Sequence, residues 1–272
     1  MLNKPTKIEV YIILWALVLA LLTLVFFWGR NRVAVPPHPV SSQKSVSTTL
    51  TPLIDSKTMT DSKQSEQTTV TLQGLTKIMA PAPVNALLLG DAIAASRGAS
   101  DLNLVSWYAL VAKDLHSKYP GTLQWQLHTN AEGTINDALN YLPEVPQDTD
   151  LIVLCLGQND PSKVKLSEFK QKYEQLLVEL KAKSPQADLF LVTEPPVKNN
   201  LENNKYFLYR GVILELAQKY QLHVIDEWTT FIQDPAPLAS LLANNVDPND
   251  KGYRVFADAV LKSFDDYLIT AN

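Results

Sequence analysis

From Pro83 onward, short runs rich in Leu, Val and Ile alternate with longer segments in which apolar residues recur at helical spacing. Strands separated by helices are joined by crossover connections, which makes the sheet parallel and covers both of its faces. The alternation therefore predicts one α/β domain over residues 83–272. We expect strands at Asn85–Leu89, Gln124–His128, Leu151–Leu156, Leu189–Thr193 and His223–Ile225, and helices at Val105–Tyr119, Ile135–Tyr141, Leu166–Ser184, Tyr206–Tyr220 and Tyr253–Leu268.

An uncharged run lies near the N-terminus. Residues 10–28, VYIILWALVLALLTLVFFW, contain no Gly or Pro and are long enough to cross a hydrocarbon core of roughly 30 Å. They predict one transmembrane helix, preceded by a short cytoplasmic N-terminus at residues 1–9. A cleavable signal peptide is the alternative, but the charged sequence GRNR follows at 29–32, where a site of small residues is expected. The run favours an uncleaved membrane anchor.

Residues 29–82 are expected to form a Ser/Thr-rich linker. Much of this segment consists of Ser, Thr, Gln and Lys, and it buries too little apolar surface to offset the entropy of ordering, which predicts disorder. A wall-spanning bacterial stalk and a simple connector both fit this composition. The basic residues that flank the anchor only slightly favour a cytoplasmic N-terminus. We expect a single-pass protein of a bacterial cell membrane whose C-terminal domain is extracytoplasmic.

Charge and cysteine content exclude several classes of partner. The net charge is −4 and no run of Lys or Arg occurs in the domain, so no nucleic acid partner is expected. Cys155 is the one cysteine and lies in an apolar run, which excludes an intramolecular disulfide and a cluster of thiolate metal ligands. It is expected to be a buried core residue. We expect no cofactor and no metal.

Four motifs follow the predicted elements in a fixed order. Gly90-Asp91-Ala92 follows the first strand, Gly133 the second, and Gly157-Gln158-Asn159-Asp160 the third, while NNVDPNDKGY at 244–253 precedes the last helix. As an ordered set, these motifs resemble the conserved blocks of the SGNH/GDSL hydrolases. The resemblance covers essentially all of residues 83–272. It implies the SGNH hydrolase fold, a flavodoxin-like three-layer α/β/α arrangement with a parallel five-stranded sheet.

The resemblance implies an acyl esterase in which a Ser attacks the carbonyl, a His removes its proton and an Asp orients the His. It places the oxyanion hole at the backbone N–H groups of Ala92 and Gly133 and at the side chain of Asn159. The three catalytic positions are altered: the nucleophile position is Ala92, the base position is Asp247 and the orienting position is Asn244. The pocket would be completed by Asp91, Gln158 and Asp160.

The altered positions predict impaired hydrolysis. Loss of the nucleophile typically costs on the order of 10⁶ in turnover, and a carboxylate is a weak base for a hydroxyl group near neutral pH. An active esterase or acyltransferase is the alternative, with Ser96 or Ser100 as a relocated nucleophile and His128 as its base. If the segment after Ala92 is helical, Ser96 lies about one turn away. A structural interaction module of the cell envelope is a further alternative.

Three carboxylates could meet at the carboxyl ends of the strands: Asp91, Asp160 and Asp247. Such a group can serve glycoside chemistry or hold a hard cation, although the resemblance favours structural roles for the first two. The sequence as a whole predicts a membrane-anchored, extracytoplasmic SGNH-like protein of the cell envelope. Its cleft would take an acylated or carbohydrate ligand, or an envelope protein.

Overall fold

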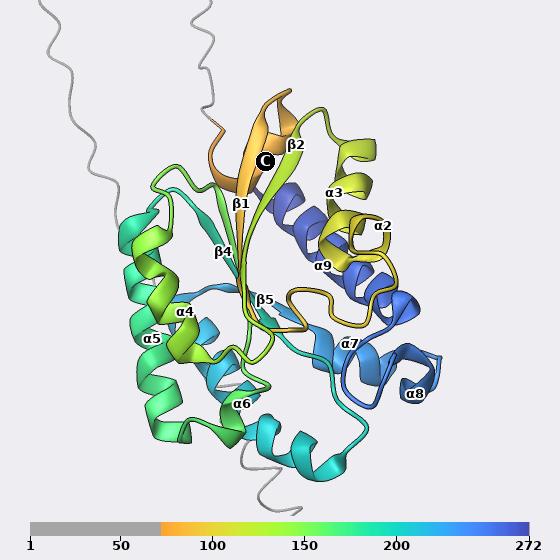
Figure 1. Ribbon diagram of the computed structural model, residues 1–272. Helices are drawn as coiled ribbons and strands as arrows, with labels where there is room; N and C mark the ends of the chain where they lie inside the picture. Colours follow the sequence, from red (N-terminus) through yellow and green to blue (C-terminus); the bar gives the residue numbers. More distant parts are fainter. Residues whose placement is uncertain (1–71, 272) are drawn as a thin grey trace, which may run out of the picture. The chain divides into compact units, whose positions relative to one another are not determined.

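Five parallel strands form one sheet in the order β2-β1-β3-β4-β5 (Figure 1). The computed structural model describes residues 72–271. The strand order is that of a flavodoxin-like sheet, and each of the five predicted strands is present. The strands are β1 (Pro83–Gly90), β2 (Thr122–Thr129), β3 (Leu151–Cys155), β4 (Asp188–Thr193) and β5 (His223–Asp226).

The helices agree with the sequence periodicity, with three differences. The helix predicted at Tyr206–Tyr220 begins six residues earlier, at Asn200. The segment predicted as one helix at Val105–Tyr119 is divided at Ser106, whose hydroxyl oxygen accepts a hydrogen bond from the N–H of Ala109 over 3.3 Å. The short helices η1, η2, η3, α7 and α8 were not predicted. The helical elements are η1 (Gly74–Met79), α2 (Leu102–Val105), α3 (Trp107–Lys118), α4 (Ile135–Tyr141), η2 (Leu142–Glu144), η3 (Asp160–Ser162), α5 (Leu166–Lys183), α6 (Asn200–Tyr220), α7 (Glu227–Gln233), α8 (Leu238–Leu241) and α9 (Asp250–Thr270).

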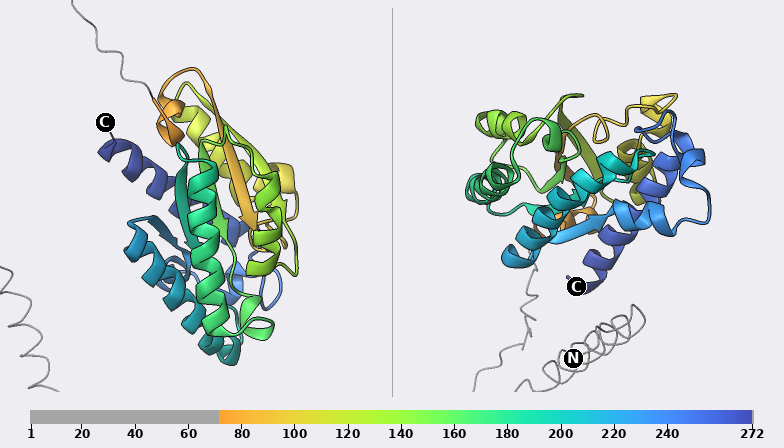
Figure 2. Two further views of the ribbon diagram at one scale, coloured as in Figure 1. Left: turned by 90° about the vertical axis from the view of Figure 1, so that its left-hand side faces the viewer. Right: turned by 90° about the horizontal axis from the view of Figure 1, so that it is seen from below.

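Helices cover both faces of the sheet, so the molecule has two buried cores. Alternate residues of a strand point to opposite faces: Ala86 and Leu88 of β1 pack in the core beneath α3 and α9, whereas Leu87 and Leu89 pack in the core beneath α4, α5 and α6. Seen from below, α4 and α5 lie on one side of the sheet and α9 on the other (Figure 2). Burial on both faces explains why the central strands β3 and β4 are continuously apolar in sequence, whereas apolar and polar residues alternate in the edge strand β2.

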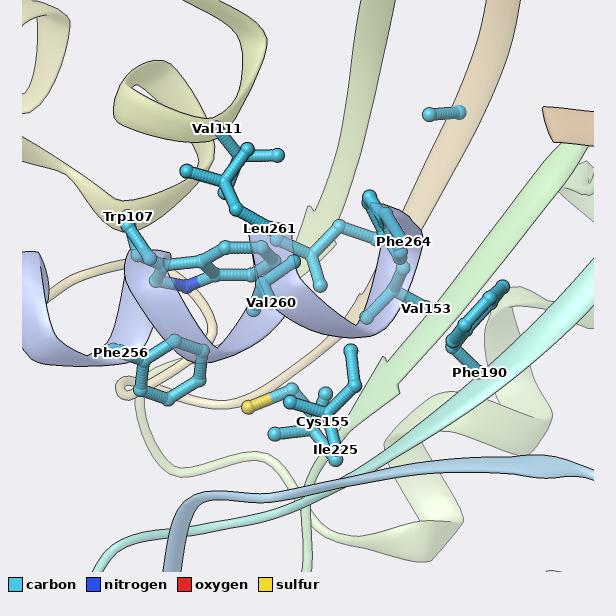
Figure 3. Packing of buried hydrophobic residues seen from close by; sticks show 14 of the residues in the cluster. Trp107, Val111, Val153, Cys155, Phe190, Ile225, Phe256, Val260, Leu261 and Phe264 are labelled. Carbon is cyan, nitrogen blue, oxygen red and sulfur yellow. The ribbon is translucent and has the colours of Figure 1, made fainter. Parts of the chain in front are cut away.

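Aromatic packing fills the core between the sheet and α9. Trp107 of α3 stacks on Phe256 of α9 with ring centroids 5.1 Å apart (Figure 3). Cys155, at the end of β3, is a free cysteine, fully buried in the same cluster. Its predicted role as a small core residue is confirmed.

The predicted N-terminal boundary of the domain at Pro83 is wrong. Leu75 and Ile78 of η1 are fully buried in the core, and the N–H of Leu75 donates to Asp188 over 2.8 Å. Residues 72–82 therefore belong to the domain and not to the linker. Two apolar residues three positions apart, within a Ser/Thr/Gln-rich stretch, are too short a pattern to predict a packed helix.

The remaining N-terminal predictions concern residues outside the described part. The cytoplasmic segment 1–9, the transmembrane helix 10–28 and the linker over 29–71 all lie there. Among residues 72–271, no helix has both the length and the hydropathy that a membrane span requires.

Both ends of the described chain lie at the amino edge of the sheet. Leu72 and Gln73 line one hollow together with Asp188, the first residue of β4, and with Ala271. In Figure 1 the described chain begins near the amino end of β1, and the strands run away from that end. The loops after the strands are therefore at the edge opposite to the point where residue 72 joins the domain.

Candidate functional site

Close contacts between backbone segments bring the loops after β1, β2 and β3 together. The N–H of Asp91 donates to the carbonyl of Cys155 over 3.3 Å, and the N–H of Asn130 donates to the carbonyl of Gly90 over 3.1 Å. A Cβ atom on Gly90 would lie only 2.1 Å from the carbonyl oxygen of Cys155. Glycine is therefore required where the motif begins, because a larger residue would separate β1 from β3.

Ala92 lies at the start of the first loop, where the family resemblance places the nucleophile. Its side chain is a buried methyl group and has no lone pair with which to attack a carbonyl carbon. Among residues 72–271, its backbone N–H has no hydrogen-bond acceptor. One of the three predicted oxyanion donors is thus available.

The other two predicted oxyanion donors are engaged within the protein. The N–H of Gly133 donates to the carbonyl of Asn130 over 2.7 Å. The Nδ2 group of Asn159 donates to the carbonyl oxygens of Gly133 (3.0 Å) and Ala131 (3.2 Å), and it lies 3.4 Å from a carboxylate oxygen of Asp91. The structure brings the predicted residues into one place, but these two donors hold the loops together.

Asp247, at the predicted base position, is paired with a cation that the sequence analysis missed. Its carboxylate is 2% exposed, and Oδ2 accepts hydrogen bonds from Nε of Arg97 over 2.7 Å and from Nδ2 of Asn244 over 2.8 Å. This hydrogen bond raises the pKa of Arg97 above its usual range. The Oδ2 atom of Asp247 therefore already accepts two hydrogen bonds within the protein.

Asn244 does not act as an orienting acid. Its Oδ1 atom accepts hydrogen bonds from the N–H groups of Val246 (2.7 Å) and Asp247 (2.8 Å), which is the geometry of a side chain that stabilises a turn. Its amide group meanwhile contributes a donor to the Asp247 carboxylate. The two altered positions therefore form one structural unit with Arg97.

Backbone geometry places Arg97 beside Asp247. Ser96 has a φ of 59° and Gly98 a φ of 100°, and a Cβ atom on Gly98 would lie 2.4 Å from the carbonyl oxygen of Pro248. The hydroxyl of Tyr253 donates to the carbonyl of Arg97 over 2.6 Å. Arg97 lies in the loop after β1, five residues beyond Ala92, and a buried carboxylate in place of His requires a cationic partner. This requirement is the signal that could have found it.

A group of buried carboxyl groups lies beneath the loops. Burial raises the pKa of Asp91 to about 6, that of Asp160 to about 7, and that of Glu194 well above its usual range. Glu194 accepts a hydrogen bond from the N–H of Gln158 over 2.7 Å, and Asp160 accepts one from the N–H of Ile135 over 3.0 Å. Asp91 likewise accepts a hydrogen bond from the N–H of Ile93 over 2.9 Å, so all three carboxyl groups hold loop backbone.

The carboxylates do not assemble into a metal site. Within residues 72–271, no three His, Cys, Asp or Glu side chains are arranged to hold a metal ion. Asp247 is instead paired with Arg97. Glu194, which the sequence analysis missed, directly follows β4 in the way that Asp91 follows β1, and this position is the signal that could have pointed to it.

The alternative nucleophiles have structural partners. Ser96 is fully buried and its Oγ accepts a hydrogen bond from the N–H of Trp107 over 3.2 Å. The Oγ of Ser100 donates to Asp250 over 2.6 Å. His128 lies 2.8 Å from Gln126 and stacks edge-on against Tyr141. The structure therefore does not bring the predicted dyad together.

A hollow of about 340 Å³ lies beside Arg97 at the carboxyl edge of the sheet. Polar side chains from the loops after β1 and β3 and from the first turns of α6 form most of its wall. The residues that line it are Arg97, Gln158, Asn159, Pro161, Ser162, Val197, Glu202, Asn203, Lys205, Tyr206 and Val246. Gln158 and Asn159 were predicted here, whereas the residues of α6 were not.

The strand order and the position of the four motifs define an α/β protein of the SGNH hydrolase type. The sequence profile of the GDSL-like Lipase/Acylhydrolase family matches residues 88–255, and the chain belongs to this family. A search of curated protein sequences gave no match.

Solved structures of esterases share the fold. A lipase/acylhydrolase from Enterococcus faecalis has a TM-score of 0.58 at 18% identity, over 67% of this chain and 96% of that one. A catalytic mutant of an acetylxylan esterase from Geobacillus stearothermophilus has a TM-score of 0.56 at 20% identity, over 66% and 93%. A psychrotrophic esterase from Pseudoalteromonas sp. has a TM-score of 0.57 at 17% identity, over 68% and 98%. At these identities the similarity establishes the fold alone.

Proposed function

We propose that this chain is a membrane-anchored, extracytoplasmic member of the GDSL-like family that binds its ligand without hydrolysing it. The observation that carries the proposal is the 2.7 Å contact between Arg97 and Asp247. The base position holds a buried anion that is already paired, next to a nucleophile position that holds only the methyl group of Ala92. An attacking oxygen and a basic nitrogen are both missing from the places where the family mechanism needs them.

The ligand that we propose is an acylated compound or a carbohydrate of the cell envelope. The hollow beside Arg97 is of the size that small-molecule sites have. An acetylxylan esterase and a two-domain esterase active on acetylated mannans share the fold, which supports this class. An envelope protein is the competing type of partner, and a hollow of about 340 Å³ supports it less well than it supports a small ligand.

Anchoring is proposed from residues 10–28, whose uncharged sequence suits a membrane span. Residue 72 joins the domain at the amino edge of the sheet, which leaves the hollow at the opposite edge. Protease treatment of intact spheroplasts tests the orientation: the domain is degraded from outside if it is extracytoplasmic and is protected if it is cytoplasmic.

Hydrolysis is tested with the full chain in detergent. We expect no turnover of p-nitrophenyl acetate above the buffer rate and no covalent labelling by a fluorophosphonate probe, because Ser96 and Ser100 are held in structural hydrogen bonds. The variants Ser96→Ala and Ser100→Ala are the matched controls. Labelling of the native chain that disappears in either variant would show an active hydrolase with a relocated nucleophile and would refute the proposal.

A further inference from the structure

We propose that the hollow beside Arg97 recognises an acidic group of its ligand, a carboxylate or a phosphate monoester carried on a sugar. The inference rests on the proposed binding function and names the chemistry of the ligand. It depends on which polar groups around the hollow still have hydrogen-bonding capacity after the contacts within the protein are counted.

The neutral polar side chains of the hollow are already engaged. Asn203 donates from Nδ2 to the carbonyl of Val197 over 2.7 Å and accepts from the N–H of the same residue over 2.8 Å. Gln158 donates from Nε2 to the carbonyl of Pro195 over 3.2 Å, and Ser162 donates to the carbonyl of Asn159 over 2.9 Å. These contacts fix the shape of the loops and leave only part of the hydrogen-bonding capacity of these side chains for a neutral sugar.

The cations of the hollow retain their donors. Arg97 uses Nε for Asp247, but among residues 72–271 neither of its terminal Nη groups has a partner, and its side chain is 46% exposed. The two Nη groups of a guanidinium group form a planar edge that matches two oxygens of a carboxylate or phosphate. Lys205 of α6 lines the same hollow and has no ion-pair partner in the described part of the chain.

The acidic groups nearby leave this preference in place. Asp247 forms an ion pair with Arg97, which offsets part of the charge of the guanidinium group but uses only its Nε donor. Glu132 forms an ion pair with Lys163 over 2.9 Å. Glu202 is the one carboxylate in the hollow's lining. Since it lies in the first turn of α6 and is exposed, water weakens its repulsion of a bound anion but does not abolish it. Replacement of Glu202 by Gln removes the remaining repulsion and is expected to strengthen the binding of an acidic ligand.

Three sugars of one ring type test the inference: D-glucuronate, D-glucose 6-phosphate and neutral D-glucose. Melting of the full chain in detergent is followed by tryptophan fluorescence at equal sugar concentration and matched ionic strength. A ligand that binds only the folded state raises the melting temperature. We expect a rise with one or both acidic sugars and none with glucose, and the two acidic sugars separate a carboxylate preference from a phosphate preference.

Variants locate the binding site. Lys205→Gln is expected to weaken binding of the acidic sugar by about fivefold, as one partly exposed charge does. Lys219→Gln, on the same helix but outside the hollow, is the matched control and should leave binding unchanged. The double variant Arg97→Gln with Asp247→Asn removes the ion pair as a unit and should weaken binding by at least about tenfold.

Two results overturn the inference and leave the proposed function standing: an equal rise with glucose, or no rise with either acidic sugar. An acid-dependent rise that is equal in the native chain, in Lys205→Gln and in the double variant also overturns it, because the acid then binds elsewhere. Failure of the proposed function is seen separately, as hydrolysis of p-nitrophenyl acetate by the native chain in the absence of sugar.

Discussion

The Nε atom of Arg97 lies 2.7 Å from a carboxylate oxygen of Asp247. Arg97 follows the first motif, in the loop after β1, and Asp247 belongs to the last motif, in the loop before α9, so the contact joins these two loops. A serine hydrolase uses the same two loops to hold its nucleophile and its base. In this protein an ion pair between the half-exposed Arg97 and the buried Asp247 joins the two loops. It lies where the family places the contact between its catalytic residues.

The ion pair is expected to contribute to stability. Arg97→Gln leaves the buried Asp247 carboxylate without its cation, and we expect the free energy of unfolding to fall by about 1–3 kcal/mol; this is less than for a fully buried pair, because water screens a half-exposed guanidinium group. Urea denaturation measures the change.

Asp247→Asn in the same background supplies the control for that prediction. The double variant should be more stable than Arg97→Gln alone, because the unpaired charge is gone. The double-mutant cycle should give a coupling energy of about 1 kcal/mol or more. Additive effects of the two changes would mean that the contact contributes nothing to stability.

The raised pKa of Asp160 is expected to make the stability of the protein depend on pH. Burial raises its folded-state pKa from 3.8 to about 7. Below about pH 4 the carboxyl group is protonated in both states and its contribution to stability is fully present. Between about pH 4 and pH 7 the unfolded chain loses the proton while the folded chain keeps it, so stability falls as the pH rises. This group therefore stabilises the protonated fold at low pH, and the contribution is lost as the pH rises through about 7.

Asp160→Asn removes this titration, since an amide oxygen can still accept the hydrogen bond from Ile135. Relative to the native chain, the variant should be more stable at pH 8 than at pH 4 by about 2–4 kcal/mol, as measured by urea denaturation at each pH. Asp266→Asn, at an exposed position on α9, should show no such difference. An equal effect of Asp160→Asn at both pH values would argue against a raised pKa.

Restoring the catalytic triad should not restore catalysis. In the variant with Ala92→Ser, Asn244→Asp and Asp247→His, the N–H of Gly133 and the Nδ2 of Asn159 are still engaged by backbone carbonyls. Loss of one oxyanion donor costs roughly 10²–10³ in turnover. We therefore expect no hydrolysis of p-nitrophenyl acetate above that of the native chain.

Far-UV circular dichroism checks that the restored variant is folded. The same variant with Ala at position 92 is its control. Turnover that depends on the Ser hydroxyl would mean that the two donors turn toward a bound ester.

Local sequence patterns predicted the strands, the order of the motifs and the altered catalytic positions. The central strands were predictable because burial on both faces demands continuous apolar runs. Ala92 and Asp247 were found because their motifs are short and linear. Arg97 was not found, because its contact with Asp247 joins loops 150 residues apart and depends on the positive φ of Gly98. Such a contact is fixed by the tertiary fold.

The domain boundary failed for a different reason. The linker composition continues up to η1, and only Leu75 and Ile78 distinguish that short helix from the residues before it. Their burial depends on contacts with β1 and on the hydrogen bond that the N–H of Leu75 donates to Asp188 of β4. The sequence of the segment alone does not reveal these tertiary contacts.

Leu75→Ala tests whether η1 is part of the domain. Leu75 is fully buried, and replacement of a buried Leu by Ala typically costs 2–5 kcal/mol, roughly, because apolar contacts are lost and a cavity remains. Leu104→Ala is the matched control: its side chain is 67% exposed, so the cost should stay within about 0.5 kcal/mol. Urea denaturation of the full chain compares the two. Equal stability of the two variants would mean that residues 72–82 belong to the linker. Removal of a leucine destabilises the domain only if that leucine packs in its core.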